Sequence, residues 1–376
     1  MQKNSSSVRK KILLTGGHAA TTAMAVVEEL KKRTSGKHQW NIFWVGPKYA
    51  MEGKKVLTSA QKILPKQGVE FHTIVSGRVQ RKFTKWTVIS LLKIPVGFIL
   101  ALVLVNRIKP DIILSFGGYA AFPVVIIGWM MRIPVVIHDQ TYSFNSSSRM
   151  VVPFVNKIAL SRERSKRYYP KGKCVVTGNP VRSGIVSIKP KDTVGDPPTL
   201  YITGGSTGSV SLNNLIEEIL ADLLASYKVL HQVGDLDYGK FESIRERLPK
   251  FMKRKYEVYK YLGPVDVVEA FRKSDIIISR AGANIVSEII MMKRPSVLIP
   301  LAVGRHNEQR KNAEYAQKCG IAVLLEQEGL SSRELLSSVN RIYKSYGDFV
   351  AEVKDKESPD LNAASSVVDI LEEIVL

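Results

Sequence analysis

The sequence predicts an α/β protein made of two consecutive doubly wound domains. Short apolar runs alternate with helical stretches along the whole chain, and this pattern is typical of buried parallel sheets. A length of 376 residues suits two domains. Each half also opens with a strand that ends in the same tripeptide, Thr15-Gly16-Gly17 and Thr203-Gly204-Gly205, so the two halves repeat one pattern.

The first half contains the expected elements of one domain. Its opening helix, 20–33, has Ala, Met, Val and Leu on one face and Glu28, Lys31 and Lys32 on the other, as a helix that covers a sheet should. In chain order we expect strand 11–15, helix 20–33, strands 40–45 and 69–74, a helix ending near Asn106, strands 111–115, 134–137 and 157–160, and a short apolar run at 174–177.

The second half repeats the alternation after a segment rich in Lys, Asp and Pro, 187–198, which is typical of a linker. We therefore place one domain at 1–186 and the other at 187–359. An amphipathic helix within 360–376 is expected to pack back on the first domain. The remaining expected elements are strands 199–203, 228–232, 256–261, 275–279, 296–299 and 322–325, and helices 213–226, 267–273, 285–292 and 308–319.

The positive charge of the chain is concentrated in its first half. The formal net charge is +21, yet residues 1–183 hold 30 Lys and Arg against 7 Asp and Glu, whereas residues 184–376 hold 25 against 27. A cationic half indicates an anionic partner: nucleic acid, an acidic membrane surface or a phosphorylated substrate. The hydrophobic share of 45% excludes a disordered or fibrous chain.

Cations interleaved with aromatic rings lie directly before an apolar run, 88–105. This composition predicts an interfacial membrane surface, although cations beside stacking aromatics also suit nucleic acid. Because the run contains Lys93 and Pro95, we expect a buried or membrane-dipping helix rather than a transmembrane span. A second basic cluster occupies 162–167. The predicted membrane surface consists of Arg78, Arg81, Lys82, Phe83, Lys85 and Trp86.

Metal and disulfide chemistry have little support in the sequence. The two cysteines, Cys174 and Cys319, are far apart, which argues against a disulfide scaffold and a cysteine-ligated zinc site. Asp235-Leu236-Asp237 has the form of a metal–diphosphate motif, but nothing else organises a metal, so we interpret it as a loop. No signal peptide is recognisable, and a cytoplasmic location is the default expectation.

Glycine pairs follow three of the predicted strands: Gly16-Gly17, Gly117-Gly118 and Gly204-Gly205, the last continuing to Gly208. Glycine lets backbone N–H groups approach a ligand, and the positive end of the following helix attracts a diphosphate. The same pairs also suit plain strand–helix turns. The lysine-bearing P-loop and the GxGxxG pattern are both absent, which disfavours ATPases and dinucleotide-dependent dehydrogenases.

Polar residues at other strand ends and helix starts are candidate site residues. His18 follows the first glycine pair at a helix start, where the helix dipole keeps an imidazole neutral and able to accept a proton. His138 follows strand 134–137 at the edge where ligands bind. A carboxylate early in a helix, Glu288, can accept ribose hydroxyls, and Glu308-Gln309 suits sugar hydroxyls. Each of these residues could instead have a structural role, as a turn residue, a cap or a charge that complements the helix dipole.

In chain order, these motifs resemble those of the peptidoglycan N-acetylglucosaminyltransferases, a family of GT-B glycosyltransferases. The likeness covers nearly the whole chain, and the collinear order of the motifs makes it specific. It rests on Lys109-Pro110-Asp111, Phe116-Gly117-Gly118-Tyr119 with Pro123, 133–140 ending in His138-Asp139-Gln140, Gly178-Asn179-Pro180-Val181-Arg182, 204–208 with Asn213, His231-Gln232-Val233-Gly234, 280–288, and Gln309 with Asn312-Ala313.

The resemblance implies two Rossmann-like domains facing a cleft, the GT-B fold, with UDP-N-acetylglucosamine held by the C-terminal domain. It implies no metal and no cofactor besides this donor substrate. By resemblance, Ser206 contacts the donor diphosphate with Thr207 in the same site, Arg182 lies near the donor, Glu288 binds the ribose, the backbone around Val265 binds uracil, and Glu308 and Gln309 contact the sugar.

The resemblance also implies that the N-terminal domain binds a polyprenyl-diphosphate-linked N-acetylmuramyl peptide at an anionic membrane surface. The acceptor residues would be Gly16, Gly17, Gly117, Gly118, Tyr119 and His138. His18 would take the proton from the C4 hydroxyl, which attacks the anomeric carbon with inversion and converts lipid I to lipid II. The family's place is the cytoplasmic face of the cell membrane, as a peripheral protein, and no nucleic-acid partner is expected.

The first glycine loop departs from the family pattern, Gly-Gly-Thr-Gly-Gly-His. Leu13-Leu14 stand where the leading glycines would be, and only Thr15-Gly16-Gly17-His18 remains. A related enzyme with another lipid acceptor is therefore one alternative. A basic nucleic-acid-binding α/β protein, suggested by charge alone, is the other.

Overall fold

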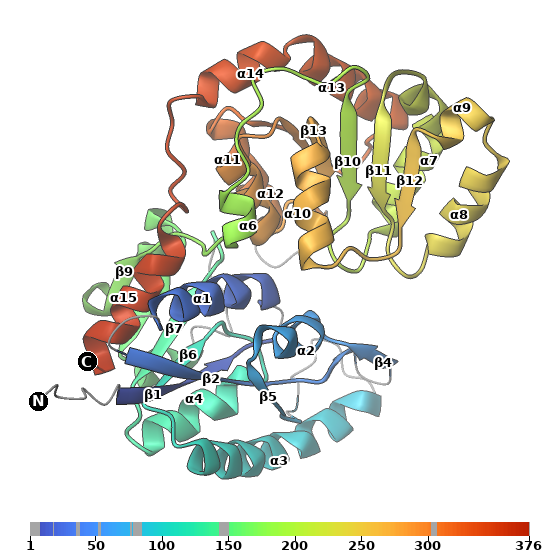
Figure 1. The fold of residues 1–376 in the computed structure, drawn as a ribbon. Helices are drawn as coiled ribbons and strands as arrows, with labels where there is room; N and C mark the ends of the chain where they lie inside the picture. The colour runs from blue at the N-terminus through green and yellow to red at the C-terminus, as the bar shows by residue number, and fades with distance from the viewer. Residues whose placement is uncertain are drawn as a thin grey trace, which may run out of the picture. The chain divides into compact units, whose positions relative to one another are not determined.

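The computed structural model describes residues 8–17, 19–34, 38–51, 54–75, 77, 85–142, 150–301 and 307–375. The chain divides into two units (Figure 1). Unit 1 is Met1–Arg182 with Pro359–Leu376, and unit 2 is Ser183–Ser358. Each unit is built on a parallel sheet covered by helices, so the predicted class of two doubly wound α/β domains is confirmed.

In the described part of unit 1, the main sheet has seven parallel strands in the order β5-β2-β1-β6-β7-β8-β9. The strands are β1 (Val8–Thr15), β2 (His38–Gly46), β5 (Glu70–Thr73), β6 (Ile112–Ser115), β7 (Val135–Asp139), β8 (Lys157–Leu160) and β9 (Cys174–Val176). The α-helices are α1 (Ala20–Arg33), α2 (Ser59–Ile63), α3 (Lys85–Ile108), α4 (Ala121–Met130) and α15 (Ala363–Val375). Helices α2 and α4 and an antiparallel hairpin, β3 (Tyr49–Met51) with β4 (Lys54–Leu57), were not among the predicted elements.

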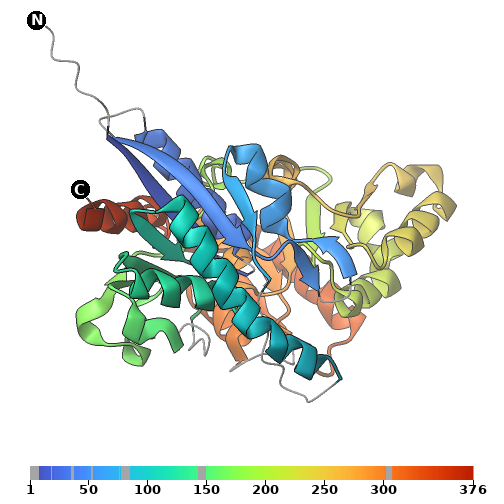
Figure 2. The ribbon, with the colours of Figure 1, turned by 90° about the horizontal axis from the view of Figure 1, so that it is seen from below.

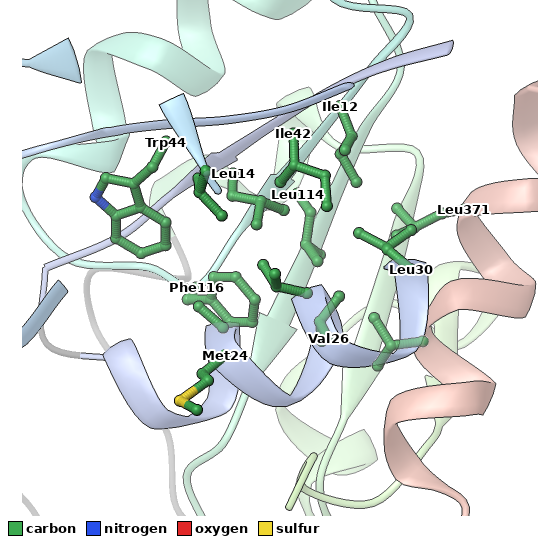
Figure 3. Packing of buried hydrophobic residues seen from close by; sticks show 14 of the residues in the cluster. Ile12, Leu14, Met24, Val26, Leu30, Ile42, Trp44, Leu114, Phe116 and Leu371 are labelled. Atoms are coloured by element: carbon green, nitrogen blue, oxygen red, sulfur yellow. The ribbon is translucent and has the colours of Figure 1, made fainter. Parts of the chain in front are cut away.

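Alternate residues of each strand in this sheet face opposite sides, so one sheet supports two cores. Ile12 and Leu14 of β1 pack with Leu30 of α1 and Leu371 of α15 (Figure 3). Leu13, between them, lies in the second core with residues of α3 and α4. The unbroken apolar run of β1 is therefore that of a strand buried on both faces.

Helix α15 completes the first core from the far end of the sequence. Arg33 of α1 pairs with Glu372 of α15 at 2.7 Å. Just before the helix in sequence, Asp360 is buried and accepts from Nη2 of Arg162 at 2.8 Å and from the backbone N–H of Asn179 at 2.7 Å. Arg162, assigned from sequence to a basic cluster, is thus neutralised inside unit 1.

The apolar run 88–105 lies within α3, which extends along one face of the unit 1 sheet (Figure 2). One side of this helix is buried, including Ala101 and Val105, whereas Ile99 and Val103 are 63% and 56% exposed. Among the described residues, none of the helices is both long enough and apolar enough to cross a membrane.

Unit 2 contains six parallel strands in the order β12-β11-β10-β13-β14-β15. They are β10 (Thr199–Thr203), β11 (Lys228–Gln232), β12 (Tyr256–Tyr259), β13 (Ile276–Ser279), β14 (Ser296–Leu298) and β15 (Ala322–Leu324). The helices are α6 (Ser183–Val186), α7 (Val210–Ser226), α8 (Tyr238–Arg247), α9 (Lys250–Lys253), α10 (Pro264–Lys273), α11 (Ala283–Met292), α12 (Glu308–Lys318), α13 (Ser332–Lys344) and α14 (Tyr346–Val353). Of these, α6, α8, α9, α13 and α14 were not predicted.

Candidate active site

The strand order of unit 2 changes direction between β10 and β13, because β11 and β12 lie to one side of β10 and the later strands to the other. In doubly wound sheets, ligands bind outside the carboxyl ends of the strands at this point. The glycine loop (residues 204–208) follows β10, and the turn 280–282 follows β13. Two of the motifs found in the sequence therefore meet at the predicted edge.

The glycine loop turns back on itself and leaves its tip in solvent. Gly205 and Gly208 have φ values of 89° and 74°, and the N–H of Gly208 donates to the carbonyl of Gly205 at 3.0 Å. A Cβ on Gly208 would lie 2.8 Å from Cα of Gly234, which follows β11. Only glycine permits this close approach, so Gly234 supports the loop. Ser206 and Thr207 are exposed at its tip, just before α7.

Arg280 is buried beside the N-terminus of α7. Its Nε donates to Oγ of Ser209 at 3.0 Å, its Nη2 to Oγ of Ser211 at 2.5 Å, and its Nη1 to the carbonyl of Ile299 at 3.0 Å. None of the described residues of unit 2 gives it a carboxylate partner, and the undescribed residues of this unit, 302–306, include no acidic residue. Burial lowers the pKa of Arg280 to about 10.

A buried guanidinium at the positive end of a helix favours an anionic ligand. The first N–H groups of α7, from Val210 on, have no acceptor within the helix, and the helix dipole adds positive potential there. A diphosphate at the glycine loop would supply the negative charge that Arg280 lacks. From the sequence, Arg280 was recognised only as part of a motif. The signal that was missed is a cation directly after a strand of three isoleucines and a serine.

The starts of α10 and α11 bring two more predicted donor residues to this edge. Val265 is the second residue of α10 and is 74% exposed, so the backbone at this helix start is accessible. Glu288 is buried in the second turn of α11, after the turn 280–282.

Helix α12 begins at the same edge with Glu308 and Gln309, the two predicted sugar contacts. The Oε1 of Gln309 accepts from the N–H of Leu301 at 3.0 Å, and Nδ2 of Asn312 donates to the carbonyl of Ala281 at 3.1 Å. Asn312 therefore fastens the first turns of α12 to the turn after β13.

The carboxyl edge of unit 1 has its own change of strand order, between β1 and β6. The N–H of Gly17 donates to the carbonyl of Gly117 at 3.1 Å, and a Cβ on Gly118 would lie 3.1 Å from N of Gly17. The structure thus brings Gly16-Gly17 against Gly117-Gly118, with half-buried Tyr119 next in the chain. These glycines place two loops in backbone contact.

His138 is the penultimate residue of β7 and lies in the interior of unit 1, only 2% exposed. Its Nε2 lies 3.1 Å from the carbonyl of Gly178, so that nitrogen is the donor. Burial lowers the pKa of His138 to about 4. In this structure the ring is therefore neutral at pH 7 and contacts the protein's own backbone.

The other predicted residues occupy varied places. Arg182 is buried and is the last residue of unit 1 before the division. Lys85 and Trp86 begin α3, but their side chains are not described. His18, Arg78, Arg81, Lys82 and Phe83 lie outside the described residues.

The two carboxylates of the Asp235–Asp237 motif have separate partners. Asp235 pairs with Lys260 at 2.6 Å, and Asp237 accepts from Nδ2 of Asn213 at 2.6 Å. Within the part of the chain that the structure describes, no three His, Cys, Asp or Glu side chains gather as metal ligands would.

Comparison with known proteins extends these observations to the whole chain. Residues 15–160 match the glycosyltransferase family 28 N-terminal domain, and residues 199–374 match the family 28 C-terminal domain. A UDP-N-acetylglucosamine–N-acetylmuramyl-(pentapeptide) pyrophosphoryl-undecaprenol N-acetylglucosamine transferase of Lachnoclostridium phytofermentans is 30% identical, over 98% of this chain and 99% of its own. Its counterpart in Legionella pneumophila strain Paris is 31% identical, over 96% of each chain.

Solved structures share the fold. MurG of Acinetobacter baumannii superposes with a TM-score of 0.69 at 21% identity, covering 97% of this chain and 99% of that one. UDP-GlcNAc 2-epimerase of Neisseria meningitidis, bound to UDP-GlcNAc, reaches 0.65 at 14% identity, over 97% and 100% of the two chains.

Proposed function

The chain belongs to glycosyltransferase family 28, and on that basis we propose that it transfers N-acetylglucosamine from UDP-N-acetylglucosamine to the C4 hydroxyl of undecaprenyl-diphosphate-N-acetylmuramyl-pentapeptide. The relatives named for this reaction match over nearly their full length. The resemblance carried by the sequence motifs is thereby confirmed.

The observation in the structure that best supports the donor half of this reaction is the environment of Arg280. A UDP diphosphate at the glycine loop would meet the exposed tip at Ser206, the free amide groups of α7 and this uncompensated cation. The same groups would stabilise the negative charge of the leaving UDP, which is electrostatic catalysis by fixed dipoles. In this proposal Glu288 binds the ribose, and the transfer needs no metal.

The acceptor half is assigned to unit 1, at the loops that follow β1 and β6. His18 is the proposed general base. It would take the proton from the acceptor hydroxyl as that oxygen attacks the anomeric carbon, which inverts the configuration there. Arg182 is proposed to add positive charge near the donor diphosphate.

A UDP-release assay with a panel of donors and acceptors tests the function. We expect turnover with UDP-N-acetylglucosamine and the polyprenyl-diphosphate-N-acetylmuramyl-pentapeptide, and loss of turnover in His18→Ala with UDP affinity retained. Turnover only with a different lipid acceptor would contradict the acceptor assignment. Salt-sensitive oligonucleotide binding with no affinity for UDP would contradict the enzyme as a whole.

We further propose that unit 1 binds the cytoplasmic face of the membrane through the outer side of α3. Val96, Ile99, Leu102 and Val103 are exposed on this helix, and the half of the chain that contains it has the basic excess. Exchanging Ile99 and Val103 for Ser should weaken flotation with anionic vesicles about tenfold, through the loss of buried apolar area. Leu236→Ser, at an exposed apolar site of unit 2, is the matched control. Equal flotation of both variants would refute this surface.

A further inference from the structure

The peptide group between Gly205 and Ser206 is held from one side by the sheet. The N–H of Gly205 donates to Oγ1 of Thr203 at 3.0 Å. The carbonyl of Gly205 accepts from the N–H of Gly208 at 3.0 Å and from Nε2 of Gln232 at 3.3 Å. Both polar groups of this glycine therefore have protein partners, although the residue itself is exposed.

The side-chain amide of Gln232 can take only one of its two orientations beside the carbonyl of Gly205. It is the last residue of β11, directly opposite Thr203 in the strand pairing, and is 3% exposed. Its Oε1 accepts from the hydroxyl of Tyr201 at 2.8 Å and from that of Thr203 at 3.4 Å. An inverted amide would turn Oε1 toward the carbonyl of Gly205, oxygen against oxygen. The carbonyl of Gly205 can only accept, so it selects the orientation with Nε2 toward the glycine loop, and the two hydroxyls donate to Oε1 and hold the amide there.

The direction of the Ser206 N–H follows from this arrangement. A trans peptide is planar, with its C=O and N–H pointing in opposite directions. Because the carbonyl of Gly205 is held toward Gln232, the N–H of Ser206 points away from the sheet. Ser206 is exposed, and among the described residues its N–H has no acceptor. The result is a fixed backbone donor aimed outward from the carboxyl edge.

We propose that Gln232 is a positioning residue for the donor diphosphate. It touches no substrate atom. It holds the Gly205–Ser206 peptide so that the N–H of Ser206 donates to a phosphate oxygen of UDP, beside the amide groups of α7 and Arg280. This inference rests on the proposed function, because that function places the diphosphate at the glycine loop.

Without Gln232, the carbonyl of Gly205 is held by the N–H of Gly208 and no longer by the sheet. The peptide can then rotate about the positive-φ glycine, and one charge-assisted hydrogen bond to the phosphate is lost. A bond of this kind changes affinity about tenfold to a hundredfold. The effect should depend on the phosphate, so uridine, which has none, should bind as before. A residue that merely supported the fold would instead change both affinities alike.

Titration calorimetry with UDP and uridine tests the proposal on the full chain. We expect Gln232→Met to bind UDP about tenfold or more weakly and uridine within twofold of the original protein. Tyr201→Phe, which removes one of the two hydroxyls that orient Gln232, should weaken UDP binding by a smaller factor of about three. The control is Asn340→Leu, which removes an amide that accepts from Tyr227 in the same unit but away from the glycine loop. It should leave both affinities unchanged.

A folded Gln232→Met with UDP affinity within twofold of the original would overturn the proposal, as would an equal loss of uridine affinity. If Gln232→Met does not fold, Tyr201→Phe decides by the same two comparisons. With selective ¹⁵N-serine labelling, the Ser206 amide proton should shift downfield on UDP binding in the original protein and not in the variant. If the unmodified protein does not bind UDP, the proposed function itself is wrong. If it binds UDP and the affinity does not depend on Gln232, this inference alone is wrong.

Discussion

The carboxyl edges of the two sheets both contain glycine pairs and a buried arginine, but these residues have different partners in the two units. In unit 1, Gly17 and Gly117 bond to each other, and Arg162 is paired with the buried carboxylate of Asp360. In unit 2, the tip of the glycine loop faces solvent, and the partners of buried Arg280 among the described residues are hydroxyls and a carbonyl. The buried arginine of one edge therefore has an internal carboxylate partner, whereas the described residues around the other provide none.

The difference shows that a glycine pair after a strand can serve two local structures. The glycines of unit 1 bring two loops into backbone contact, whereas those of the glycine loop turn a peptide group outward. The nearest buried arginine differs as well: Arg162 has an internal carboxylate partner, and Arg280 has none among the described residues of unit 2.

The largest expected effect tests the paired arginine. Arg162→Met leaves the carboxylate of Asp360 buried without its ion-pair partner, which should lower the free energy of unfolding by about 3–5 kcal/mol. Urea denaturation measures it, and UDP affinity should not change. Adding Asp360→Asn should recover much of the loss. If Arg162→Met alone lowers the free energy of unfolding by less than about 1 kcal/mol, the ion pair between Arg162 and Asp360 does not stabilise unit 1 as proposed.

The unpaired arginine should give the reverse result. Arg280→Met should weaken UDP binding about a hundredfold, or about 3 kcal/mol, because a buried cation interacts strongly with a phosphate. The free energy of unfolding should change less than in Arg162→Met, since no buried carboxylate is left behind. Calorimetry and urea denaturation together distinguish the two arginines, and unchanged UDP affinity would rule out a ligand role for Arg280.

The glycine contact of unit 1 gives a smaller effect on stability. Gly118 has a φ of 95°, and its added Cβ would press on the backbone of Gly17, so Gly118→Ala should cost about 2 kcal/mol. In Gly17→Ala the new Cβ would lie 3.8 Å from Cα of Gly118, an ordinary contact, and the loss should stay within about 1 kcal/mol. Thermal denaturation of the pair measures the difference. Equal losses would show that this close approach is not specific to Gly118.

The smallest expected effect is a difference in acid stability. His231 is buried between the hydroxyl of Tyr256 and Oδ1 of Asn213, and burial lowers its pKa to about 3. At a pH between about 3 and 6.5, the unfolded chain therefore binds a proton at His231 that the folded chain does not bind. Stability should therefore fall as pH falls, by about 1.4 kcal/mol per pH unit once the unfolded form is fully protonated.

Replacing His231 by Gln removes one titrating group, so the free energy of unfolding should fall less steeply as the pH is lowered. Urea midpoints between pH 6.5 and 5 measure this change. His138→Gln should do the same for unit 1, because burial also holds the pKa of His138 low, near 4. An unchanged slope in both variants would mean that neither imidazole stays neutral inside the fold.

The fold class followed from the sequence because strands buried on both faces contain unbroken apolar runs, such as 12–14 in β1 and 276–278 in β13. The helices α8 and α9 and the hairpin of β3 and β4 were missed because they are short and contain no such run. Glu288 and Gln309 were predicted from motif order. The proposed roles of Arg280 and Gln232 came only from their three-dimensional neighbours. The distances from Arg280 to Ser209 and from Gln232 to Gly205 depend on strand pairing between segments 27 to 71 residues apart.

The return of α15 to unit 1 determines the order in which the chain can mature during synthesis. Unit 2 is inserted in sequence between Arg182 and Pro359, so its residues leave the ribosome as one continuous stretch. The core that contains Leu30 and Ile12 remains uncovered until the segment with Val367 and Leu371 has emerged. Unit 2 can therefore complete its fold before unit 1, whose first core also needs residues 359–376.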